Sequence, residues 1–189
     1  MLSARILRTS ATLPSKRIFT SLSPSFQATM SSSTLPSPVP IVLIGIHTEI
    51  GRSVAEALRP DWDIVRFIQT YEAAQADLPY LLKGEAPPAA PTNSVGSGNY
   101  SQPARAVLFG RGFTQQQAET LYEQHADSAT SPPVLWAAGA EANRKPLPAG
   151  IEVPPNVDKI VVPIFKGLLE DWKKKVEGEG KKEGELVLY

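Results

Sequence analysis

The segment best suited to ligand chemistry is a short glycine-containing turn in the first third of the 189-residue sequence. It follows an apolar run directly and leads into an amphipathic stretch. Glycines in such a turn let backbone N–H groups approach a phosphate, and the N-terminus of the following helix favours negative charge. The candidate cofactor-binding residues come from this turn, with one glycine from a second turn: Gly45, Ile46, His47, Thr48, Ile50, Gly51, Arg52 and Gly110.

The second turn, Gly110 to Gly112, precedes a capping box formed by Thr114 and Gln117. It is either a second anion-binding turn or, more commonly, a tight connection between strand and helix. His47 lies in the first turn, where it either contacts a ligand or is a solvated or capping residue. His125 falls on an apolar helical face, which is typical of a core or boundary histidine.

Several kinds of catalytic chemistry are excluded by composition. The chain has no cysteine, which rules out disulfides, thiol nucleophiles and cysteine-ligated zinc. With two histidines, we expect no histidine-rich metal site. The sequence also lacks the GxSxG, P-loop and HExxH motifs, so catalytic residues stay unassigned.

Apolar runs alternate with helical stripes along the body of the chain. The strands are predicted at 40–45, 62–68, 106–109, 133–136 and 158–162, and the helices at 50–58, 71–82, 114–125 and 163–176. Pro79 is expected to break the second helix in two, and Thr48 to cap the first. This alternation predicts the α/β class, with a small doubly wound, mostly parallel sheet of about five strands.

The chain divides into four parts by composition. Residues 1–29 are expected to be a mitochondrial transit peptide and 30–39 a linker. Residues 40–178 form the α/β domain, and 179–189 are expected to be a charged flexible tail. Within the domain, 86–103 is rich in Pro, Gly and Ser and is predicted as a long loop.

Charge is distributed unevenly between the N-terminal part and the remainder of the chain. Residues 1–40 contain four bases and no acid, which favours import into the mitochondrial matrix, whereas a start at Met30 would give a cytosolic form. The remainder carries 15 bases and 19 acids, which argues against nucleic acid as a partner. No apolar run reaches the length of a membrane span.

The first turn and its helix resemble the cofactor loop of the short-chain dehydrogenases/reductases, whose pattern is TGxxxGxG. Gly45 matches the first glycine and Gly51 the last, and residues 50–58 are similar to the family's first helix. The resemblance covers residues 40–59 and implies a Rossmann-like fold with NAD or NADP as cofactor. The middle glycine is Glu49 here, whose carboxylate would repel a phosphate unless Arg52 offsets it.

Two further features depart from that family. Its catalytic Tyr and Lys lie four residues apart, and no tyrosine here has a lysine at that spacing. The second strand lacks an acid for the ribose hydroxyls of NAD. Arg66 either favours the 2′-phosphate of NADP or points into another layer.

These features leave three hypotheses open. One is a Rossmann-like protein that binds NAD(P), another nucleotide or a small molecule, without dehydrogenase catalysis. The second is a non-catalytic mitochondrial interaction or assembly protein that keeps only the fold. The third is an enzyme of another class that uses loop 86–103 as a lid. The oligomeric state is open.

Overall fold

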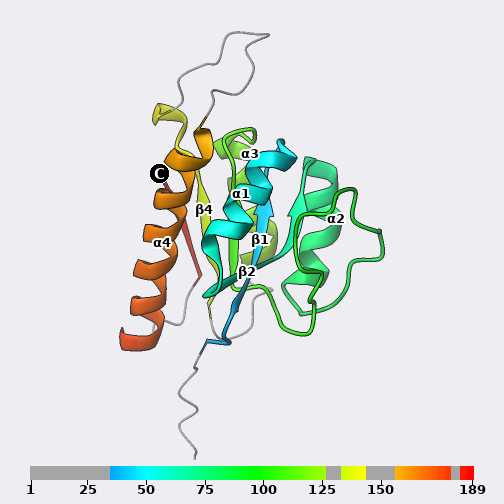
Figure 1. The fold of residues 1–189 in the computed structure, drawn as a ribbon, viewed down its shortest axis with the longest axis horizontal. Helices are drawn as coiled ribbons and strands as arrows, with labels where there is room; N and C mark the ends of the chain where they lie inside the picture. Colours follow the sequence, from blue (N-terminus) through cyan, green and yellow to red (C-terminus); the bar gives the residue numbers. More distant parts are fainter. Residues whose placement is uncertain (1–34, 127–132, 144–155, 180–183) are drawn as a thin grey trace, which may run out of the picture. The chain divides into compact units, whose positions relative to one another are not determined.

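Five segments of the chain form one parallel sheet in the computed structural model, which describes residues 35–126, 133–143, 156–179 and 184–189 (Figure 1). The strand order is β2-β1-β3-β4-β5. This order is that of the flavodoxin-like doubly wound folds and confirms the predicted fold class. The strands are β1 (Val39–Ile44), β2 (Trp62–Ile68), β3 (Ala106–Phe109), β4 (Leu135–Ala138) and β5 (Glu185–Leu188).

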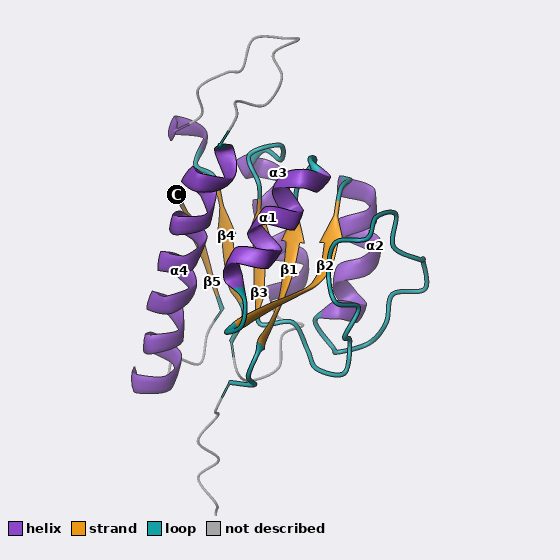
Figure 2. Ribbon diagram, in the orientation of Figure 1, coloured by secondary structure: helices purple, strands orange, loops and turns teal. Residues whose placement is uncertain are grey.

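Helices cover both faces of the sheet, as Figure 2 shows. One face carries α1 (Thr48–Leu58) and α4 (Val157–Glu179), and the other carries α2 (Tyr71–Leu81) and α3 (Gln115–His125). All six residues of β1 are buried, because this strand is paired on both sides and covered on both faces. Continuous apolar strands are therefore explained by burial on two faces.

The predicted fifth strand at 158–162 is wrong, because these residues belong to α4. Val161 begins an apolar stripe that continues through Phe165, Leu169, Trp172 and Val176, all buried. That spacing of three and four residues is helical, whereas the short run Ile160–Val162 taken alone resembles a strand. The fifth strand is β5, so the predicted flexible tail at 179–189 is also wrong for residues 184–189.

The last crossover has an unusual hand. The chain moves from β1 to β2 in one direction along the sheet, and from β4 to β5 in the other. Since α1 and α4 lie on the same face, the two connections have opposite hands (Figure 2). Parallel crossovers are almost always right-handed, so general topology rules favour a different face for α4.

Two smaller predictions are also corrected. Pro79 lies inside a continuous α2 and does not divide it. It is two residues from the end of the helix, so few residues follow the backbone hydrogen bond that proline cannot donate. β4 begins at Leu135, two residues later than predicted. The transit-peptide prediction and the first half of the linker, residues 30–34, fall outside the described residues.

Loop 86–103 lies along the outer edge of β2. The backbone N–H groups of Ser97 and Gly98 donate to the carbonyl oxygens of Ile64 and Val65 at 2.8 and 3.1 Å. Gly96, with φ +110°, passes so close that a Cβ there would be 3.0 Å from the Val65 oxygen. An exposed strand edge invites pairing with other chains, and this loop occupies it.

Candidate functional site

The two glycine turns meet at the carboxyl ends of β1 and β3. These strands are neighbours, with Ile44 aligned to Phe109, and the chain leaves them in opposite directions along the sheet. The Gly110 N–H donates to the Ile44 oxygen at 2.7 Å, and a Cβ on Gly110 would be 3.5 Å from the Gly45 Cα. Ligands in doubly wound folds bind at this topological switch point.

The first turn of α1 offers backbone donors to this place. His47 is its N-cap residue, and the His47 side chain makes no capping hydrogen bond. The first helical hydrogen bond runs from the Gly51 N–H to the His47 oxygen at 3.0 Å. The amides of Thr48, Glu49 and Ile50 precede that bond and lie at the positive end of the helix dipole.

Thr48 does not cap the helix as predicted. It is the first residue of α1, and its hydroxyl accepts a hydrogen bond from Gln69 Nε2 at 3.2 Å. Gln69, at the end of β2, thereby joins the turn to its neighbouring strand.

Gly45 and Gly51 both face the ring of Phe67 on β2. A Cβ on Gly51 would lie 2.9 Å from two of its ring carbons, and one on Gly45 would lie 3.2 Å from Cε2. The two glycines therefore let the turn and α1 pack closely over an aromatic ring. In Rossmann-type turns the last glycine has this role of close helix–strand packing.

Glu49 and Arg52 form an exposed ion pair in the first turn of α1. The Arg52 Nη1 lies 3.2 Å from Glu49 Oε2, and the side chains of Arg52 and Glu49 are 48% and 82% exposed. The Arg52 guanidinium thus partly offsets the negative charge of the Glu49 carboxylate. An acid in the first turn of a helix also interacts favourably with the helix dipole, so Glu49 stabilises α1 whether or not a ligand binds.

Ile46 gives the site an apolar element. It is 48% exposed and lies over Gly112, because a Cβ on that glycine would collide with Ile46 Cδ1. The place where the two turns meet therefore combines backbone donors with an exposed apolar side chain. The side chains of the remaining predicted residues, Ile50 and Arg52, belong to α1.

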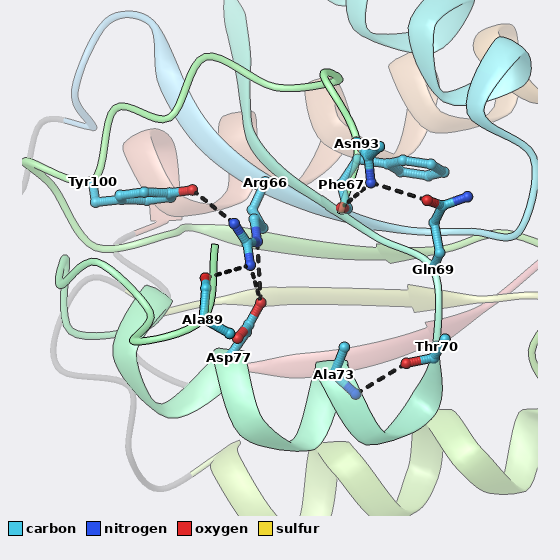
Figure 3. Close-up of polar contacts among 9 residues, drawn as sticks. All are labelled: Arg66, Phe67, Gln69, Thr70, Ala73, Asp77, Ala89, Asn93 and Tyr100. Atoms are coloured by element: carbon cyan, nitrogen blue, oxygen red, sulfur yellow. Dashed lines mark hydrogen bonds and ion pairs between the residues drawn. The ribbon is translucent and has the colours of Figure 1, made fainter. Parts of the chain in front are cut away.

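Arg66 does not point toward a cofactor. It is 5% exposed and faces α2, where Nε and Nη2 donate to Asp77 Oδ2 at 3.0 and 2.8 Å (Figure 3). Its other contacts are the Ala89 oxygen at 3.1 Å and the Tyr100 hydroxyl at 3.5 Å. The alternative in which Arg66 binds a 2′-phosphate is therefore wrong, and the side chain secures loop 86–103.

Sequence reasoning missed the residues that support the second turn. The Tyr189 hydroxyl donates to the Phe109 oxygen at 2.7 Å, and Arg111 Nη1 donates to the Asn143 oxygen at 3.4 Å. Both contacts join residues 32 or more positions apart. No local sequence pattern predicts contacts of that kind.

His125 ends α3 and lies away from the glycine turns, in agreement with the boundary position expected for it. Its Nε2 is buried, and burial lowers the pKa of the imidazole below its ordinary value. A lowered pKa in the folded state means that the unfolded state binds the proton more readily.

We therefore expect the contribution of His125 to stability to be complete above its ordinary pKa of 6.5 and to be lost as the pH falls below it. Urea unfolding at pH 7.5 and 5.5 would measure this loss. His125→Gln should show a smaller decrease between the two pH values than the wild type. Equal decreases would contradict this role.

Two further features of the described residues bear on partners. They contain no group of three or more His, Cys, Asp or Glu placed to hold a metal ion. Within the same residues, no helix has both the length and the apolar character needed to cross a membrane.

Comparison with known proteins gives one distant relative. The chain is 24% identical over 136 residues to "Kojic acid related protein 6" of Aspergillus oryzae (strain ATCC 42149 / RIB 40), covering 72% of this chain and 79% of that protein. No family model matches the chain, and no solved structure matches it.

Proposed function

We propose that the protein binds a phosphate-bearing small molecule of the nucleotide class where the Gly45 and Gly110 turns meet, without short-chain-dehydrogenase catalysis. The observation that carries the proposal is the N-terminus of α1, where the His47 side chain makes no capping hydrogen bond, beside Gly110 at the switch point of the sheet. Three backbone amides there have no helical partner. The Tyr/Lys pair that would support hydride transfer is absent from the sequence.

The contacts at the end of β2 favour a mononucleotide over NAD or NADP. In dinucleotide-binding folds an acidic residue near this point holds the adenosine ribose. Here the position is occupied by Gln69, whose amide is engaged with Ile46, Thr48 and Asn93. A ligand held mainly by the two turns needs no such ribose contact.

The second candidate is an interaction or assembly protein that keeps only the fold. The packing of Gly45 and Gly51 against Phe67 favours it, because both glycines then have a purpose that requires no ligand. The third hypothesis, an enzyme with loop 86–103 as a lid, has less support, since that loop is hydrogen-bonded along β2.

Calorimetric titration of the full chain distinguishes the first two candidates. The ligands are flavin mononucleotide, ADP, NAD(H) and NADP(H), with kojic acid added because of the relative's name. Binding of the mononucleotides, weakened by Gly112→Asp, would support the proposal. No binding by any nucleotide, with the fold intact by circular dichroism, would leave the interaction protein as the better explanation.

Glu49→Gln provides a second test of the same site. Removing a negative charge near the α1 amides should strengthen binding of an anionic nucleotide about twofold to fivefold, since charges a few ångströms apart in water interact by ~1 kcal/mol. Glu56→Gln, on the exposed side of the same helix but two turns away, is the matched control and should change nothing. Equal effects of the two substitutions would refute a site at the helix N-terminus.

A further inference from the structure

One side-chain amide connects loop 86–103 to the turn proposed to bind the ligand. Gln69 Nε2 donates to the Ile46 oxygen at 2.9 Å and to Thr48 Oγ1 at 3.2 Å. Its Oε1 accepts from Asn93 Nδ2 at 3.1 Å (Figure 3). Both ends of the Gln69 amide are therefore engaged, and they join two segments that are far apart in the sequence.

The direction of this chain of hydrogen bonds is set by the backbone. Asn93 Oδ1 accepts from the Val95 N–H at 3.0 Å, and its Nδ2 also donates to the Phe67 oxygen at 3.1 Å. With Oδ1 fixed in this way, Nδ2 must face Gln69 and only Oε1 can accept from it. The Gln69 NH₂ group is then forced toward the turn.

Loop 86–103 does not depend on this contact for its attachment. Val95 is buried in the core on the α1 side, and Tyr100 contacts Arg66 on the α2 side. Ser97 Oγ donates to Asp63 Oδ2 at 2.7 Å. The loop is thus held on both sides of β2 by other residues, and the Asn93–Gln69 bond can serve another purpose.

We propose that Asn93 and Gln69 are positioning residues that fix the backbone of the Ile46–Thr48 segment and couple it to loop 86–103. The part of this inference that concerns ligand affinity rests on the proposed function, whereas the coupling itself does not. Coupling between two sites is reciprocal, so the free energy by which the attached loop favours ligand binding equals the free energy by which a bound ligand favours the attached loop. A ligand that tightens the turn should therefore also protect the loop from exchange.

Amide hydrogen exchange, resolved by NMR on the full chain, tests the coupling without a ligand. Its reporters are the Gly45 and Gly51 amides, bonded to the Ile68 and His47 oxygens at 2.9 and 3.0 Å. Asn93→Asp keeps the shape but cannot donate to Gln69, so Gln69 turns its oxygen toward the Ile46 oxygen. We expect both amides to exchange about fivefold faster or more, as losing one hydrogen bond implies.

Two further variants separate coupling from loop anchoring and from charge. Asn93→Leu removes the donor without adding a charge and should accelerate the same two amides. Ser97→Ala removes a loop anchor that does not contact Gln69, and it should accelerate exchange in the loop alone. The inference is overturned if Asn93→Asp and Asn93→Leu affect only loop amides, as Ser97→Ala does.

Titration with flavin mononucleotide then tests the link to the site. Asn93→Leu should weaken its binding at least about fivefold while Ser97→Ala leaves it unchanged. Unchanged binding in Asn93→Leu, despite faster exchange at Gly45 and Gly51, would overturn the link to affinity. If the wild type binds no mononucleotide, the proposed function fails, and the exchange result alone decides whether the coupling exists.

Discussion

Asp77→Ala is expected to lower the free energy of unfolding by about 3–5 kcal/mol, because it leaves the buried Arg66 guanidinium without its counter-charge. The side chains of Arg66 and Asp77 are only 6% and 3% exposed, and both hydrogen bonds of the pair end on the same Asp77 oxygen. The other described contacts of Arg66 are a carbonyl and a hydroxyl oxygen, which carry no compensating charge. Urea unfolding followed by circular dichroism measures the loss.

Two other variants make the interpretation specific. Asp171→Ala breaks the ion pair between Asp171 and Lys174, whose side chains are 73% and 78% exposed. Because this pair is on the surface, the substitution should lower the free energy of unfolding by less than ~0.5 kcal/mol. The double variant Arg66→Met/Asp77→Leu removes both charges and should recover much of the stability lost in Asp77→Ala. A loss in Asp77→Ala no larger than that in Asp171→Ala would refute a structural role for the buried pair.

Fold class could be predicted because burial on both faces is visible in the sequence. The runs that form β1, β2 and β3 are mostly apolar, and each is followed by a helical stripe or a turn. The C-terminal part could not be predicted for a physical reason. Val161 and Val162 are β-branched, as strand residues often are, yet they pack near the start of a helix.

The site could be predicted only in part. The two glycine turns are visible in the sequence, and their adjacency follows once β1 and β3 are neighbours. The roles of Gln69 and Asn93 could not be predicted from the sequence, because the hydrogen-bond partners of an amide side chain are decided only by folding. The face of the sheet to which the Arg66 side chain points depends on a bulge in β2 opposite Ile41 and Val42. The bulge shifts the alternation of side chains between the two faces along the strand.

Gly51→Val is expected to destabilise the protein by about 1–3 kcal/mol, the usual cost of forcing extra carbon atoms into a packed interior. Gly51 is buried, and even a single Cβ there would be 2.9 Å from the Phe67 ring. Gly51→Ala should therefore already destabilise. The measurement is again urea unfolding at neutral pH.

Gly167→Ala is the matched control, because Gly167 lies in α4 and a Cβ added to it would meet nothing within 4 Å. An alanine there should stabilise the helix by ~0.5–1 kcal/mol, the opposite sign from Gly51→Ala. In a Phe67→Leu background, Gly51→Ala should cost clearly less than in the wild type, since the two residues are in contact. If Gly51→Ala instead left stability unchanged and weakened only mononucleotide binding, this glycine would be making room for the ligand and not for Phe67.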